Sequence, residues 1–595
     1  MKQVKFYLLV VAIVICHAVV RAVPAYRGSV TMKQPDGSTI VVRIVGDEFG
    51  HYYLGDDDAI LLAGADGALC YAAVDADGKL SATDRIAHGS ALRSESERLF
   101  VASQNRTDIL QAFERQRKEA VCRAGNAMRQ IAPGKITPIF PTTGEVEGLV
   151  ILAEYQDVKF STPDIGDVYS QLANQENYSG SYASGSVRDY FVDQSSGLFK
   201  PHFTVVGPVT LPHDRAYYGI DEKNAQMIID ACEEAKLQGV DFSKFDADND
   251  GNVDFVFVVY AGYGEAQGGP SESVWPSAVD LTYESWKTYD GLYLGKSACS
   301  CELHGNQGTL LDGIGTFVHE FSHILGLADI YDTNRAGSGF GMSDWDVMDH
   351  GCYNDDSKTP SGYTAMDKYT VGWLTPVVLE NAAKDYRLNA LSTSNEAFFI
   401  VNPAESNEYY TLENRQPVKW DKGLPGHGLI ISHVHYVRSL WGANRVNASN
   451  SGYEHVALMA ADNNKSSTTF AGDPFPGTSH NVAFTDQSSP AAFWHVGAAG
   501  VNAPLTNIRE QDGIILFDFK SDETAVSEQV ATSMPTMVAT EGTLLIANPA
   551  KTEVRVFDVT GKLVYRSKAS SVSLSLPRAT YIVATDGYSR KINVE

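Results

Sequence analysis

The sequence predicts an α+β fold divided into several domains, and three observations lead to this prediction. The chain has 595 residues, more than one ordinary domain contains. Residues 313–323 are mostly small or apolar but carry two histidines four positions apart, as a buried helix with a polar site would. The regions on either side consist of short β-type runs separated by Gly, Pro and Asn turns. We therefore expect one mixed domain flanked by β-rich domains.

The formal net charge of −26 argues against a nucleic-acid partner, which would require a basic surface. At the N-terminus, Lys2 and Lys5 precede an apolar run too short to span a bilayer, and a small-residue cleavage site ends at Ala22. Residues 1–22 are therefore expected to be a signal peptide. We expect the chain to be exported, either secreted or attached to the outer-membrane surface.

Residues 23–135 are expected to form a propeptide. Its first half contains β-type runs such as 39–45 between Asp-Gly turns, and its second half, residues 97–129, is charged and helical in pattern. Pro133 and Gly134 then break the chain before a domain expected over residues 136–375.

An acidic loop in this domain predicts a calcium site. Oxygen ligands occur at loop positions 1, 3, 5, 7 and 9, with Gly251 at the sharp turn, whereas Phe257 stands where a bidentate acid would complete a helix-loop-helix sensor. The expected calcium ligands are Asp246, Asp248, Asp250, Asn252 (through its carbonyl) and Asp254. A solvated acidic turn is the alternative, but aspartates this close would repel one another without a cation. The loop leads into 255–260, a strand expected to be buried on both faces.

The pattern H-E-x-x-H-x-x-G-x-x-D predicts a catalytic zinc site. His319 and His323 lie one helical turn apart and can offer two imidazoles to one ion. Gly326 can end the helix and bring Asp329 round as a third ligand, which leaves a fourth position for water. Glu320 would then accept a proton from that water and pass it to the leaving amine.

The H-E-x-x-H part of this pattern also occurs by chance, so the neighbouring residues are needed to support a catalytic site. Met348 follows in a turn-like segment, as in the metzincin zinc peptidases, although a methionine alone would be an ordinary core residue. Asp332 is an alternative third ligand or a ligand for nearby calcium. Tyr353, His350 and backbone amides are the candidates for stabilising the oxyanion, and we select Tyr353.

The cysteines can form disulfides, remain buried thiols or bind the metal. Because the chain is expected to be exported, we expect at least one disulfide among four of them, although four buried thiols would also fit. These four are Cys232, Cys299, Cys301 and Cys352. Cys122 could cover the zinc as a thiolate, but an incidental linker cysteine is the favoured interpretation.

Residues 376–523 are expected to form a β-sandwich packed on the catalytic domain. We interpret His427, His433 and His435 as structural, and we expect Glu413 and Arg415 to form an ion pair that braces the site. Residues 524–540 have a linker composition, and residues 541–595 are expected to form a small β-sandwich.

The chain resembles the immune inhibitor A family of secreted, metzincin-like metalloproteases over about residues 140–520. The matching segments, besides the zinc helix, are 148–157, 185–191, 274–276, 345–351, 372–374, 412–416 and 424–433. The resemblance implies a zinc endopeptidase that cleaves proteins or peptides, with His319, His323 and Asp329 as ligands. Most metzincins have histidine rather than aspartate as the third ligand. Residues 541–595 are similar to sorting domains of type IX secretion, which implies contact with that machinery.

A second functional class is a catalytically silent surface protein, stabilised by calcium, that has kept the fold for adhesion or binding. The presence of His319, Glu320 and His323 together argues against it, because a silent relative need not keep all three.

Overall fold

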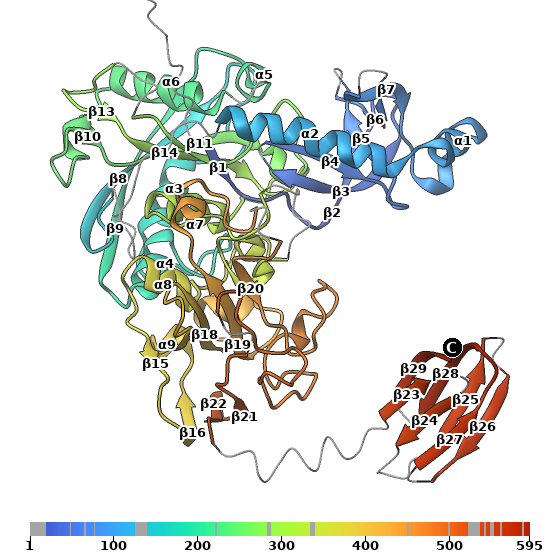
Figure 1. Cartoon of the computed structure of the whole chain (residues 1–595). Coiled ribbons are helices and arrows are strands. Elements are labelled where there is room, and N and C mark those ends of the chain that lie inside the picture. The colour runs from blue at the N-terminus through green and yellow to red at the C-terminus, as the bar shows by residue number, and fades with distance from the viewer. Residues whose placement is uncertain are drawn as a thin grey trace, which may run out of the picture.

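The fold is described from a computed structural model (Figure 1). The structure describes residues 20–124, 140–521 and 536–594, with short gaps at 48, 65–66, 76–77, 221–222, 283–286, 334–339, 449–451, 498–499, 541–542, 548–552, 560–561, 570 and 586–587. Most of the expected signal peptide therefore lies outside the described residues, as do Pro133 and Gly134. Within the described ranges, no helix combines the length and the apolar character needed to cross a membrane.

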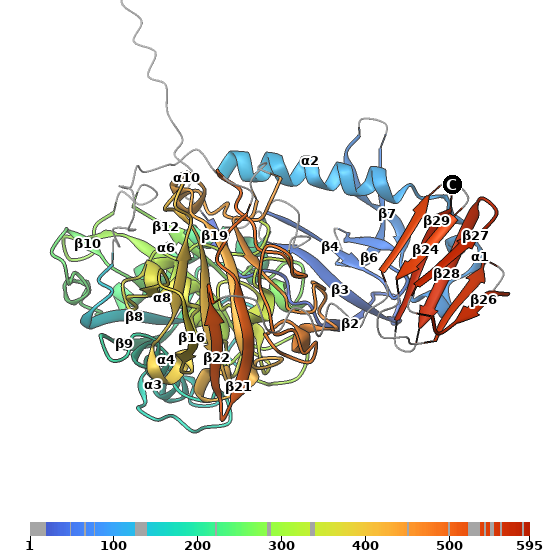
Figure 2. The same ribbon diagram turned by 60° about the horizontal axis from the view of Figure 1, so that its bottom comes forward.

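The expected propeptide begins with a six-stranded antiparallel meander. Its strands are β2 (Ser29–Lys33), β3 (Thr39–Asp47), β4 (Gly50–Leu54), β5 (Ile60–Ala63), β6 (Leu69–Val74) and β7 (Leu80–Ile86). Two helices follow, α1 (Glu95–Ser103) and α2 (Arg106–Ala124). Ile109, Ala112 and Phe113 lie on one face of α2 and form an apolar cluster with strands of the meander (Figure 2). The β-rich first half and helical second half are thus as predicted.

The domain that the sequence predicts to be catalytic is built on a six-stranded sheet with the order β1-β12-β14-β11-β8-β9. Four strands pair in parallel, namely β8 (Gly144–Glu154), β9 (Phe199–Thr210), β11 (Val256–Tyr263) and β14 (Lys296–Leu303). The antiparallel strands β12 (Ser277–Asp280) and β1 (Val20–Ala22) form one edge of the sheet. β10 (Asn252–Val253) and β13 (Tyr293–Leu294) form a separate two-stranded ribbon.

Both faces of this sheet are covered, which explains its continuous apolar strands. Leu149 and Ile151 of β8 belong to one apolar cluster, whereas the alternating Val150 and Leu152 belong to another. The first cluster includes α6 (Asn224–Leu237), and the second includes α3 (Ile165–Asn174), α4 (Val187–Gln194) and α7 (Gly315–Ile324) (Figure 1). The short helices α5 (Arg215–Gly219) and α8 (Ala365–Thr370) complete the domain. The prediction that β11 is buried on both faces is confirmed.

Residues after the catalytic domain form two sheets around a shared apolar core. The larger contains β15 (Val377–Val378), β17 (Phe398–Val401), β18 (Glu408–Arg415), β19 (Gly428–His435) and β20 (Val456–Leu458). The smaller contains β16 (Ala383–Leu388), β22 (Ile514–Phe519) and β21 (Leu505–Gln511). The helices α9 (Leu391–Ser394) and α10 (Arg438–Gly442) lie in the connections. This is the expected β-sandwich.

The C-terminal unit also consists of two antiparallel sheets with their own core. One contains β23 (Thr536–Thr540), β24 (Thr543–Ala547) and β27 (Ser571–Ser575), and the other contains β26 (Leu563–Ser567), β25 (Val554–Asp558), β28 (Ala579–Thr585) and β29 (Tyr588–Val594). The unit therefore includes residues 536–540, which the composition had assigned to the linker, because their backbone pairs with β24.

Candidate metal centre

Helix α7 presents His319 and His323 to the interior of the catalytic domain. Phe317, Phe321 and Ile324 on the same helix belong to its large apolar cluster, and this packing fixes how the helix is rotated. The two imidazoles are fully or almost fully buried, with ring centroids 4.9 Å apart. The helix ends at Ile324, and Gly326 adopts a left-handed φ of 102°, so the chain can turn back as predicted.

The turn brings Asp329 beside both imidazoles. Its Oδ1 lies 3.2 Å from His319 Nε2 and 3.4 Å from His323 Nε2. These three residues form a buried group whose ligand atoms all lie within 4.8 Å of one another. Asp332 is buried but does not belong to this group. The geometry therefore favours Asp329 over Asp332 as the third ligand.

The other ring nitrogens set the tautomers of both histidines. His319 Nδ1 lies 2.7 Å from the carbonyl oxygen of Val347, and His323 Nδ1 lies 3.0 Å from that of Leu327. With Nδ1 donating to a carbonyl, each Nε2 presents a lone pair, the form that binds a metal. Within the described residues, neither His319 Nε2 nor Asp329 Oδ1 has a hydrogen-bond partner. Two imidazole nitrogens and a carboxylate oxygen that converge in this way fit a zinc ion.

Asn444, which the sequence did not reveal, holds Asp329 in place. Its Oδ1 accepts a hydrogen bond from the Asp329 backbone at 2.8 Å, and its Nδ2 donates to Asp329 Oδ2 at 2.5 Å. The residue follows α10 with a φ of 53°, a conformation that asparagine tolerates better than most residues. Asp329 Oδ1 therefore remains directed at the imidazoles. Asp329 and Asn444 are 115 positions apart, so no local sequence pattern predicts their contact.

Glu320 is fully buried next to the first ligand. Its Oε1 accepts a hydrogen bond from the Val23 backbone N–H at 2.8 Å, whereas its Oε2 has no partner within the described part of the chain. Burial raises the pKa of Glu320 well above its usual range, and the Asp329 carboxylate raises it further. Such a side chain is suited to taking up and returning a proton.

The predicted methionine turn lies against this centre. Met348 is fully buried in the same apolar cluster as α7, and its carbonyl oxygen accepts a hydrogen bond from Ile330 at 3.0 Å. The preceding residue, Val347, supplies the carbonyl that orients His319. The turn therefore positions the first ligand and also contributes to the core beside it.

The two side chains considered for the oxyanion have other partners. The Tyr353 hydroxyl donates to the carbonyl oxygen of Pro24 at 2.8 Å. His350 Nδ1 lies 2.5 Å from Asp349 Oδ1, and burial is the main cause that lowers the pKa of His350 to about 4. Tyr353 thus contacts the N-terminal segment.

The acidic loop brings together three of its predicted ligands. Asp246, Asp248 and Asp254 form a group with carboxylate oxygens within 4.8 Å of one another. Asp250 Oδ1 instead accepts hydrogen bonds from the backbone and side chain of Asn252, both at 2.8 Å. Burial, with Asp248 and Asp246 as further contributors, raises the pKa of Asp254 to about 7.

A third group, Glu408, His433 and His495, lies in the β-sandwich. Glu408 accepts hydrogen bonds from His433 Nε2 at 2.9 Å, from the backbone of His495 and Val496 at 2.6 and 3.1 Å, and from Asn402 at 2.8 Å. Its oxygens are therefore occupied by protein donors, which agrees with a structural role for His433.

The predicted ion pair between Glu413 and Arg415 is confirmed. Arg415 is fully buried and contacts Glu413 at 2.9 Å and Asp421 at 2.6 Å. It also donates to the carbonyl oxygens of Trp345 and Gly362, both at 3.0 Å. Arg415 therefore ties the β-sandwich to the segment that carries the methionine turn.

The expected disulfide is not present. Cys232, Cys299, Cys301 and Cys352 are all free and buried. Cys232, Cys299 and Cys301 lie in one apolar cluster, where a thiol packs as a small apolar side chain. The side chain of Cys122 lies outside the described residues.

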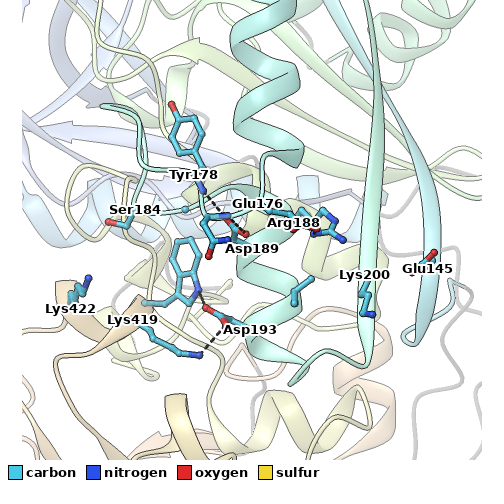
Figure 3. Close-up of a pocket in the computed structure, with 14 residues that line it drawn as sticks. Glu145, Glu176, Tyr178, Ser184, Arg188, Asp189, Asp193, Lys200, Lys419 and Lys422 are labelled. Atoms are coloured by element: carbon cyan, nitrogen blue, oxygen red, sulfur yellow. Dashed lines mark hydrogen bonds and ion pairs between the residues drawn. The ribbon is translucent and has the colours of Figure 1, made fainter.

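A polar cavity of about 760 Å³ lies between α4 and residues 419–422 (Figure 3). Two ion pairs lie in its lining, since Asp193 accepts from Lys419 at 3.0 Å and Arg188 contacts Glu176 at 2.8 Å. None of the residues that line it belongs to the centre on α7. Beside that centre lies the N-terminal segment, through Val23 on Glu320 and Pro24 on Tyr353.

Comparison with known proteins agrees with this geometry. Residues 152–374 match the family model described as immune inhibitor A peptidase M6, catalytic domain. The chain contains an M6 peptidase domain. M6 is a family of metalloendopeptidases.

Two curated relatives cover parts of the chain. Immune inhibitor A of Bacillus thuringiensis subsp. alesti is 27% identical over 271 residues, which are 37% of this chain and 38% of the relative. Pre-pro-metalloprotease PrtV of Vibrio cholerae serotype O1 (strain M66-2) is 24% identical over 232 residues, which are 34% of this chain and 24% of the relative. The chain thus spans less than two fifths of the length of either relative.

Proposed function

We propose that the chain is a secreted zinc-dependent endopeptidase that hydrolyses peptide bonds of extracellular proteins. The observation that carries this proposal is the convergence of His319, His323 and Asp329 beside the buried Glu320. The match of residues 152–374 to a metalloendopeptidase family supports it independently.

The residues of the site have separate roles in the proposed reaction. His319, His323 and Asp329 would hold the zinc ion, which when bound lowers the pKa of a coordinated water and polarises a carbonyl group. Asn444 keeps the Asp329 carboxylate in its orientation. Glu320 takes the proton from the attacking water and delivers it to the leaving amine, so that it acts first as base and then as acid.

Chelation tests this proposal. We expect the purified chain, once activated, to cleave an unfolded protein, to lose that activity when a chelator removes the metal and to regain it when zinc is returned. A chain that contains zinc and has been activated but cleaves no protein would contradict the proposal. That result would favour the alternative of a catalytically silent surface protein.

We propose further that residues 23–135 keep the peptidase latent until they are cut away. The hydrogen bonds from Val23 to Glu320 and from Tyr353 to Pro24 support this role, because they hold residues 23 and 24 against the site. Activity of the intact chain equal to that of a chain cleaved within residues 125–139 would contradict latency.

Calcium is proposed as a second, structural ion at Asp246, Asp248 and Asp254, because these carboxylates face one another. We expect millimolar calcium to raise the melting temperature and Asp248→Asn to reduce that effect. An equal melting temperature with calcium and with a chelator would contradict this site.

The C-terminal unit is proposed to direct type IX secretion, by its resemblance to sorting domains and its separate two-sheet core. Deletion of residues 536–594 should then leave the chain inside the cell. Export of the shortened chain at the normal level would contradict this assignment.

A further inference from the structure

In the precursor, before the expected cut after Ala22, an extended stretch of the chain's own N-terminus lies against the candidate metal centre. β1 pairs antiparallel with the edge strand β12, with Ala22 opposite Ser277. Ala22 and Val23 are completely buried. Addition of an extended peptide to a free sheet edge is a common way for proteins to bind peptides. The segment therefore shows how a peptide can lie along β12 beside the metal centre.

Both the N–H and the carbonyl group of the amide that joins Ala22 to Val23 form hydrogen bonds with the protein. Its N–H donates to Glu320 Oε1 at 2.8 Å. Its carbonyl oxygen accepts a hydrogen bond from the Tyr331 hydroxyl at 2.6 Å. A peptide bond that is about to be cleaved needs a proton donor next to its nitrogen and a hydrogen-bond donor next to the oxygen that becomes negatively charged. Glu320 and Tyr331 occupy these two positions.

The residues after this bond are held by different groups. Trp275 Nε1 donates to the carbonyl oxygen of Val23 at 2.9 Å, and the Tyr353 hydroxyl donates to that of Pro24 at 2.8 Å. The Tyr353 contact is thus two residues further along the peptide than the Tyr331 contact. In this alignment Tyr353 binds the portion of the peptide after the cleaved bond, whereas Tyr331 faces the bond itself.

Tyr331 is also rigidly placed. It is only 1% exposed and lies two residues after Asp329, on the turn that delivers the third ligand. Ile330, between them, is bonded through its N–H to Met348 at 3.0 Å. A hydroxyl fixed in this way can stabilise developing charge without first reorganising, which is the condition for strong electrostatic catalysis.

We propose that Tyr331 is a catalytic residue that stabilises the carbonyl oxygen of the scissile peptide, an inference that rests on the proposed peptidase function. As the oxygen of water bonds to the carbonyl carbon, the π electrons move to the carbonyl oxygen, and Tyr331 donates its hydrogen bond there. The carbon–nitrogen bond then breaks while Glu320 returns the water's proton to the nitrogen. One water is consumed, and an acid and an amine are released.

Substitution of single hydroxyl groups tests this role. The full-length chain, loaded with zinc and activated by limited proteolysis, is assayed on a fluorogenic peptide containing Val-Arg-Ala-Val-Pro-Ala-Tyr, the sequence of residues 20–26. We expect Tyr331→Phe to lower kcat by about 100- to 1000-fold, the usual effect of losing one donor to the oxyanion, with little change in KM. Tyr353→Phe should mainly raise KM. Tyr217→Phe, at a 39% exposed position, is the matched control and should behave as wild type.

A second readout distinguishes catalysis from simple anchoring of the propeptide. A phosphinic analogue of the same peptide imitates the tetrahedral, charged state, so its inhibition constant should rise in Tyr331→Phe in proportion to the loss of kcat/KM. A Tyr331→Phe enzyme that contains zinc and keeps kcat within about twofold of wild type would overturn the proposal. If wild type with zinc cleaves no peptide at all, the peptidase function itself fails, and the assignment of Tyr331 fails with it.

Discussion

At the residue scale, the decisive feature of the centre is that each ligand is oriented by a second group. The carbonyl oxygens of Val347 and Leu327 orient the two imidazoles, and Asn444 orients the carboxylate. Burial would raise the pKa of Asp329, but the facing imidazoles of His323 and His319, when protonated, outweigh this effect and hold that pKa well below its usual range. The third ligand is therefore a carboxylate in its charged form.

Removal of the Asn444 side chain should weaken zinc binding. We expect Asn444→Gly, which preserves the positive φ, to lower zinc affinity by about 10- to 100-fold, the usual effect of losing a partner of a metal ligand. Competition with a chromogenic chelator measures this affinity. Asn463→Gly is the matched control, because Asn463 has the same φ of 53° at an exposed position. Equal zinc affinity in the two variants would show that Asn444 does not support the site.

At the scale of elements, α7 depends on neighbours from distant parts of the chain. Arg415 on β18 is fully buried with Glu413 and Asp421, and it also binds the carbonyl oxygens of Trp345 and Gly362. Since both carboxylates would be left buried without their cation, this arginine stabilises the joint between the sandwich and the methionine turn.

Removal of the buried Arg415 guanidinium should lower the stability of the fold. We expect Arg415→Leu to lower the free energy of unfolding by about 3–5 kcal/mol, the usual penalty for breaking a buried ion pair. The half-exposed pair of Arg188 and Glu176 provides the comparison, and Arg188→Leu should cost at most about 1 kcal/mol. Chemical denaturation of both variants measures the difference, and similar losses would show that burial of Arg415 has no special role.

The N-terminal meander of β2 to β7 should lose stability as the pH rises above 6.5. Hydrogen bonds to Glu97 and then Asp36 raise the pKa of His88 above its ordinary 6.5. A raised pKa means that the folded state favours the protonated ring. This stabilisation is complete below pH 6.5 and is lost as the pH rises through the folded-state value.

Hydrogen exchange can follow this change locally. We expect the amides around Ser38 and Ser94 to lose protection as the pH rises above 6.5, after correction for intrinsic exchange rates, because His88 connects these turns through Asp36 and Glu97. His88→Gln should remove the pH dependence. Protection that is independent of pH in the wild-type chain would contradict a role for this histidine.

At the scale of the whole molecule, sequence patterns predicted what depends on local spacing. Helical periodicity identified His319 and His323, and the helix-ending Gly326 led to Asp329. Alternating and continuous apolar runs predicted the sandwich and the buried strand β11. These features follow from neighbours within a few residues of one another.

Features that depend on distant contacts were not predictable. Val23 reaches Glu320 across 297 positions, and Tyr331 reaches Ala22 across 309. Residues 20–22 were interpreted as the end of a signal peptide, and their pairing with β12 depends on an edge strand more than 250 residues later. The disulfide prediction was wrong because cysteine counts do not reveal that three of the four thiols pack in one apolar core while Cys352 packs in another.

The central claim is that the centre on α7 hydrolyses peptides and that Glu320 transfers the proton. The most direct measurement compares wild type with Glu320→Gln for both zinc content and peptidase activity on an unfolded protein. We predict equal zinc content, because Glu320 is not a ligand, and a loss of activity of at least about 100-fold. Full activity in the zinc-loaded Glu320→Gln chain would contradict the account.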